Sequence, residues 1–213
     1  MNRYSLLSAH QFRTLKYFID SNNYSTKFKK IFDTNSVTSL VNNIRKFADE
    51  NKCIGYEKNI TEDECKNKVK GDIWEIFALF WLNSFGGDRG LNLFNITNAN
   101  RDERGIDMYG TNYEGNTAII QVKYKFNENS SFQKGELETF AFAAIGSDIT
   151  RSENENVKSV FLFTSTKPNW KLEKDICVID IKKIKERATN KNLGFWNTMK
   201  NEIESALNFS IKK

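Results

Sequence analysis

The chain has few of the residues that loosen, cross-link or anchor a protein. Its 213 residues include one proline and 11 glycines, so no disordered linker rich in these residues is expected. The longest apolar run, Ile73–Leu82, contains Glu75 and is too short to span a bilayer. No charged-then-apolar signal segment opens the chain. We therefore expect a soluble, intracellular protein of the cytoplasm without a membrane partner.

Histidine and cysteine are scarce as well. The single histidine, His10, lies far from any acidic motif, which excludes a Ser/His triad and a nuclease built on histidine-bound metal. The three cysteines, Cys53, Cys65 and Cys177, are odd in number and lack the spacing of a metal site. We expect them to be reduced, structural thiols.

Apolar and basic residues are what the chain has in quantity. Apolar residues make up 39% of it, including 17 phenylalanines, enough for one domain of ordinary size or a domain with a small appendage. The net charge of +5 and the pI near 9.0 favour a polyanionic partner without establishing one. Short lysine clusters carry much of the charge, and such clusters are more often solvated helix faces than binding sites: Lys27, Lys29 and Lys30; Lys66, Lys68 and Lys70; Lys182, Lys183 and Lys185.

Residues 1–60 are expected to form a helical N-terminal segment. Apolar residues recur at helical spacing over Phe12–Ile19 and again over Val37–Phe47. Short helices rich in lysine and asparagine could contact DNA or a partner, or they could cover the core as a scaffold. The scaffold interpretation is preferred here, and residues 61–213 are expected to form the main domain.

A long helix is predicted to follow that segment. Thr61 and Glu64 have the spacing of a capping box, and Gly86-Gly87 supplies a stop signal after about Ser84. The second half of this helix is apolar nearly all round, which indicates burial. Glu75 is its only charge there, so it needs a proton, a basic partner or a metal. The ordinary alternative is an ion pair at the rim of the core.

The remaining elements alternate between strands and helices. The order predicts a mixed α/β sandwich, with a central sheet of about four or five strands and helices on both faces. The expected elements are a strand over Leu91–Thr97, a hairpin over Gly105–Phe126, a helix over Gln133–Ile145, strands over Val157–Thr164 and Ile176–Ile181, and helices over Lys182–Arg187 and Phe195–Leu207.

The hairpin carries the candidate site. Asp107 lies on its first strand, and Gln121 and Lys123 share one face of its second strand because side chains alternate. If the two strands pair, Asp107 can lie beside both. A carboxylate and an amide oxygen can hold a hard divalent cation, while an ammonium can orient water or neutralise developing charge. The ordinary alternative is a hairpin with a solvated Gln/Lys face.

These residue types suit hydrolysis of a phosphodiester bond. Asp107 would bind the metal directly, Gln121 through its amide oxygen or a water, and Val122 through its carbonyl. Glu75 would reach the ion through water. Lys123 would hold the attacking water or a nonbridging phosphate oxygen, as its flexible point charge allows.

Glu75 on a helix, then Asp107, then Gln121-Val122-Lys123 on the next strand resemble the PD-(D/E)XK nuclease superfamily. The Gly-Ile-Asp lead-in and the glutamine are similar to its Mrr-like restriction endonuclease branch, as is the later run Phe161–Thr166. The likeness covers roughly Val69 to Ile181. It departs from the pattern in two ways: Ile106 stands where a proline is usual, and a glutamine replaces the second acid, which leaves the number of metal ions open.

The resemblance implies a restriction-endonuclease-like fold and Mg²⁺-dependent cleavage of DNA, with Mn²⁺ as a substitute ion. Such an enzyme is either a free-standing restriction-type enzyme or the nuclease module of a larger restriction or helicase protein. The expected partners are DNA and either a second copy of the chain, in a homodimer, or a fused or associated helicase or translocase. A structure-selective nuclease similar to junction resolvases is one alternative, and it predicts a symmetric dimer that prefers branched DNA. A DNA-binding module that keeps the fold without cutting is the other.

Overall fold

The computed structural model describes residues 24–50, 61–88, 90–99, 106–125, 127, 130, 159–166 and 176–211. The chain divides into two compact units. Met1–Phe77 with Lys185–Lys213 is called the helical unit below, and Ala78–Ile184 is called the sheet unit. The predictions for His10 and for the helix at 133–145 concern residues outside the described ranges. The predicted domain division after residue 60 stays a prediction.

Two short helices near the start of the helical unit bury their apolar faces against each other. Helix α2 (Tyr24–Phe32) and helix α3 (Val37–Glu50) are joined by the rings of Phe28 and Phe47, whose centroids lie 5.9 Å apart. The Ser36 hydroxyl accepts a hydrogen bond from Ser39 N at 3.1 Å and so caps α3. The predicted helical character of residues 37–47 is confirmed.

The long helix α4 (Glu62–Phe85) begins and ends close to where the sequence predicts. Thr61 N donates to Glu64 Oε2 at 2.8 Å, and Glu64 N donates to Thr61 Oγ1 at 3.2 Å, which is the reciprocal pair of a capping box. At the other end, a Cβ on Gly86 would clash with the carbonyl oxygen of Leu82, so only glycine fits there. None of the helices in the described ranges combines the length and apolar character needed to cross a membrane.

Two further helices follow the last strand. Helix α7 (Ile181–Arg187) buries Ile181 and Ile184, and helix α8 (Leu193–Ile211) belongs to the helical unit. In that unit the ring of Phe77 in α4 stacks on Trp196 in α8, with centroids 6.2 Å apart. Both helices were predicted with somewhat narrower bounds.

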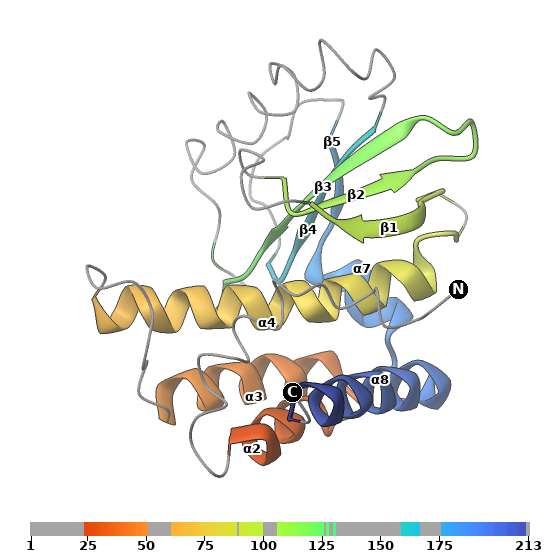
Figure 1. Cartoon of the computed structure of the whole chain (residues 1–213). Helices are drawn as coiled ribbons and strands as arrows, with labels where there is room; N and C mark the ends of the chain where they lie inside the picture. The colour runs from red at the N-terminus through yellow and green to blue at the C-terminus, as the bar shows by residue number, and fades with distance from the viewer. Residues whose placement is uncertain are drawn as a thin grey trace. The chain divides into compact units, whose positions relative to one another are not determined.

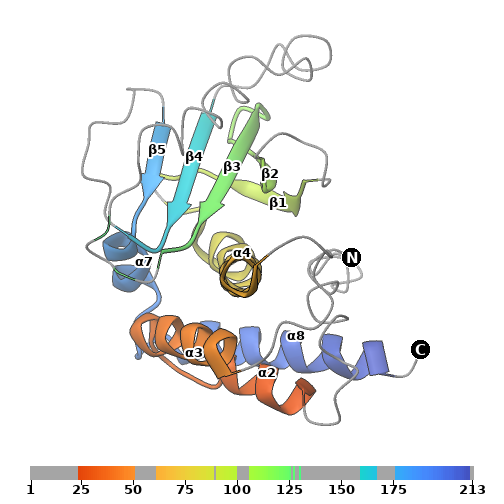
Figure 2. The same ribbon diagram turned by 90° about the vertical axis from the view of Figure 1, so that its left-hand side faces the viewer.

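The sheet unit contains a five-stranded mixed sheet in the order β1-β2-β3-β4-β5, which confirms the predicted α/β class and strand number. Strands β1, β2 and β3 are antiparallel neighbours, and β3, β4 and β5 are parallel (Figures 1 and 2). The strands are β1 (Phe94–Asn98), β2 (Met108–Thr111), β3 (Thr117–Lys123), β4 (Ser159–Thr164) and β5 (Ile176–Ile179).

Strand β3 lies at the centre of the sheet and is buried on both faces. Ala118, Ile119 and Ile120 are each 1% exposed or less. The C-terminal half of α4 packs on this sheet, since the ring of Trp81 lies 5.4 Å from that of Phe163 in β4. A strand held in this way is a rigid base for a site.

The expectation of reduced cysteines is wrong for Cys65, which is disulfide-bonded. Cys177 in β5 is a free thiol, and its burial raises its pKa while the charge of Lys183 lowers it by less. Spacing rules for cysteine detect metal motifs. They do not detect a disulfide, because the folded chain determines which sulfurs come within bonding range.

The capping box generates a pH-dependent prediction. The Thr61 backbone N–H and hydroxyl hold the pKa of Glu64 below its ordinary value of 4.5. A lowered pKa stabilises the folded state above the unfolded pKa, and that contribution is lost as the pH falls through the lowered value. Glu64→Gln should therefore lower the free energy of unfolding at pH 7 and leave it unchanged well below pH 4.5. Urea unfolding at both pH values measures this, and equal losses at both would contradict it.

Candidate metal site beside strand β3

The predicted hairpin is present and is closed by a tight polar turn. Strands β2 and β3 pair with Met108 opposite Ile120 and Thr111 opposite Thr117. In the turn, Asn112 Oδ1 accepts hydrogen bonds from Glu114 N at 3.0 Å and Asn116 N at 2.9 Å. This side-chain bonding is typical of an Asx turn, so the residues between the strands fix the strand register themselves.

Asp107 lies where the pairing of β2 with β3 becomes irregular. Its backbone N donates to Ile120 O at 3.0 Å, although Met108 is the residue paired with Ile120. Two consecutive residues therefore oppose a single residue, which is the arrangement of a β-bulge. A bulge changes the direction of nearby side chains. Just before this bulge, Ile106 packs with Ile119 in a buried cluster.

The Asp107 carboxylate lies against the middle of the Gln121-Val122-Lys123 motif. Its Oδ2 accepts a hydrogen bond from Val122 N at 2.6 Å. A charged acceptor makes such a bond strong, so it fixes the position of the carboxylate. The N–H and C=O of one strand residue point to the same strand edge, so the Val122 carbonyl also faces the side where Asp107 lies.

Gln121 is the residue for which the ordinary alternative fails. A solvated Gln/Lys face was that alternative, yet Gln121 is 4% exposed, and its Oε1 is buried without a hydrogen-bond partner. An unsatisfied buried amide costs about 1–3 kcal/mol. A cation would satisfy this oxygen, and carboxylate, amide and carbonyl oxygens are the donors that Mg²⁺ takes. These donor types suit a Mg²⁺ ion.

Lys123 is the last residue of β3 and is half-buried. Side-chain alternation places it on the same face as Gln121. Within the described ranges no hydrogen bond or ion pair engages its ammonium, while its carbonyl accepts a hydrogen bond from Ser165 N at 3.2 Å. Among the described residues, its charge is therefore not neutralised by an ion pair.

A buried serine that sequence reasoning did not assign to the site holds the end of β3. The Ser165 hydroxyl accepts a hydrogen bond from Lys125 N at 2.6 Å and donates to Lys125 O at 2.7 Å. Together with the bond from its own N–H to Lys123 O, this fastens the strand end beside β4. The Thr164-Ser165-Thr166 ending was the available signal, but its role depends on the pairing of β3 with β4.

Glu75 lies in α4, in the helical unit, while the other predicted site residues lie in the sheet unit. Its neighbours Trp74 and Ile76 are buried as expected, but Glu75 itself is only half-buried. Its contact with the metal through water stays a prediction. Among the described residues no group of three His, Cys, Asp or Glu side chains could hold a metal, so the candidate site depends on amide and carbonyl oxygens.

Models of known protein families give no match to this chain, and no curated protein matches it. The resemblance to PD-(D/E)XK nucleases therefore rests on the motif residues and their order in the sequence.

The unsatisfied oxygen of Gln121 predicts a variant that is more stable without metal. Gln121→Met keeps the length of the side chain and removes the buried amide, so the free energy of unfolding in EDTA should rise by about 1 kcal/mol. Added Mg²⁺ should stabilise the wild type, because ligand binding favours the folded state, and should leave Gln121→Met unchanged. Urea unfolding with and without Mg²⁺ measures both effects. A destabilised variant in EDTA would show that the amide already has a partner.

Proposed function

We propose that this chain is a Mg²⁺-dependent endonuclease that hydrolyses phosphodiester bonds of DNA. The observation that carries the proposal is the buried, unpartnered Gln121 Oε1 next to the peptide that binds the Asp107 carboxylate. Lys123 follows on the same strand face. The net charge of +5 supports a polyanionic substrate.

Asp107, Gln121 and the Val122 carbonyl would hold the Mg²⁺ ion, and Mn²⁺ would substitute because it accepts the same oxygen donors. When bound, such an ion lowers the pKa of a coordinated water and neutralises charge on the phosphate. With a single carboxylate in this set, metal affinity should be weak until a substrate phosphate adds another oxygen.

The chain's own residues position the substrate. The Val122 N–H fixes the Asp107 carboxylate at the strand edge, so little reorganisation is needed when substrate binds. The Lys123 ammonium binds a nonbridging oxygen of the scissile phosphate or holds the attacking water, since a flexible point charge suits either task. Ser165 keeps the strand end that carries Lys123 in place.

Cleavage assays with plasmid, linear and branched DNA test the proposal. Asp107→Asn and Lys123→Ala should each lower the initial rate by about a hundredfold or more. The first removes the carboxylate that would hold the metal, and the second removes a positive charge that stabilises the transition state. Lys191→Ala, which removes an equal charge at an exposed site, is the matched control and should cut at the wild-type rate. Thermal unfolding of each variant verifies that it is folded.

The same assays decide between the related functions. Cleavage restricted to branched DNA would identify a structure-selective nuclease. DNA that is bound but left intact by the wild type with both Mg²⁺ and Mn²⁺ would identify a non-cleaving DNA-binding module and contradict the proposal.

A further inference from the structure

Helix α2 buries one face and presents lysines on another. Its sequence contains no acidic residue. Phe28, Ile31 and Phe32 are each 1% exposed and anchor it in the helical unit. Lys27 and Lys30 remain exposed, and their spacing of three residues places them side by side on the helix surface.

These two lysines line a pocket between α2 and α3. The pocket has a volume of about 320 Å³, and Lys46 of α3 adds a third exposed lysine to its lining. Among the described residues of the lining, Glu50 is the only acidic one, and its carboxylate lies 3.8 Å from Lys46 Nζ. An exposed pair of this kind is weak, so a phosphate can compete for Lys46.

The position of these lysines is fixed by contacts between the two helices. Asn43 Nδ2 in α3 donates to the carbonyl oxygen of Ile31 at the end of α2, at 3.1 Å. Ile31 and Phe47 are buried and supply an apolar floor to the pocket. The lysines therefore project from a rigid two-helix base.

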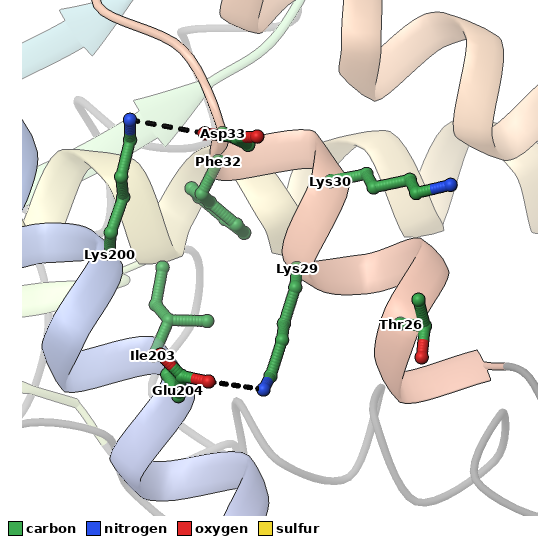
Figure 3. A pocket seen from close by; sticks show the side chains of 8 residues that line it. All are labelled: Thr26, Lys29, Lys30, Phe32, Asp33, Lys200, Ile203 and Glu204. Atoms are coloured by element: carbon green, nitrogen blue, oxygen red, sulfur yellow. Dashed lines mark hydrogen bonds and ion pairs between the residues drawn. The ribbon is translucent and has the colours of Figure 1, made fainter.

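A second pocket beside α2 contains ion pairs. It has a volume of about 260 Å³ and lies between α2 and α8, and carboxylates meet two of its lysines (Figure 3). Lys29 Nζ lies 2.6 Å from Glu204, and Lys200 Nζ lies 3.2 Å from Asp33. Lys30 points away from both ion pairs in this view. Lys30 lines this pocket as well as the one beside α3, so the two pockets share this lysine.

We propose that Lys27, Lys30 and Lys46 form a docking surface for the phosphate backbone of nucleic acid. Ammonium groups bind phosphate as point charges, and the described lining of this pocket contains three exposed lysines and one carboxylate. All three lysines are exposed, so they do not enclose a single small anion. A polymer whose phosphates contact several of these lysines at once is therefore the favoured partner. Phosphate contacts carry no base information, so this surface binds without sequence preference.

Salt-dependent binding tests the docking surface. Fluorescence anisotropy with labelled duplex DNA in EDTA compares the wild type with the triple variant Lys27→Ala/Lys30→Ala/Lys46→Ala. The slope of log affinity against log salt should fall by about 2–3, because each phosphate contact contributes about 0.9. Affinity for two unrelated sequences should fall by the same factor.

The matched control is Lys182→Ala/Lys185→Ala/Lys191→Ala, which removes the same charge elsewhere and should change the slope by less than about 1. Equal effects of the two triple variants, or an unchanged slope in the first, would overturn the docking surface. The docking surface would also be overturned if inorganic phosphate displaced DNA from the wild type more strongly than chloride of equal ionic strength does, because that result indicates a small-anion pocket. Metal-free conditions separate this result from the nuclease proposal. If the chain binds DNA through these lysines but does not cleave it when metal is added, the docking surface is supported and the nuclease proposal is contradicted.

Discussion

The hydrogen bond from Val122 N to Asp107 Oδ2, at 2.6 Å, is the contact on which the candidate site depends. It links the Asp107 carboxylate, which is the one carboxylate of the motif in the sheet unit, to the backbone of Val122, between Gln121 and Lys123. The β-bulge at Asp107 and Met108 makes it possible, because the bulge gives the carboxylate access to an N–H at the strand edge. This bond holds the Asp107 carboxylate against the strand that carries Gln121 and Lys123.

The rest of the sheet unit holds that contact in place. Strand β3 is central, is covered on both faces and pairs with β4 up to Lys123 opposite Thr164. Ser165 then fastens the backbone beyond the strand end. Gln121 is buried in this central strand, and its Oε1 has no hydrogen-bond partner there. The unsatisfied oxygen is a local cost that metal binding would offset.

Local patterns predicted most of the fold. The capping box at Thr61, the glycine stop at Gly86 and the hairpin turn depend on residues close in sequence, and the structure confirms them. The bulge at Asp107, the bonds of Ser165 and the disulfide at Cys65 depend on residues brought together by folding, and periodicity carries no signal for them. The burial of Gln121 was not predictable for the same reason. Strand alternation assigns the face of the strand on which its side chain lies, but it does not show which residues cover that face.

Anomalous diffraction from crystals grown with Mn²⁺ tests the central claim most directly. The account predicts one anomalous peak within bonding distance of the Asp107 carboxylate and Gln121 Oε1, and no peak there in crystals of Gln121→Met. A wild-type structure in which a water or a side chain bonds Gln121 Oε1, with Mn²⁺ bound elsewhere or not at all, would contradict it.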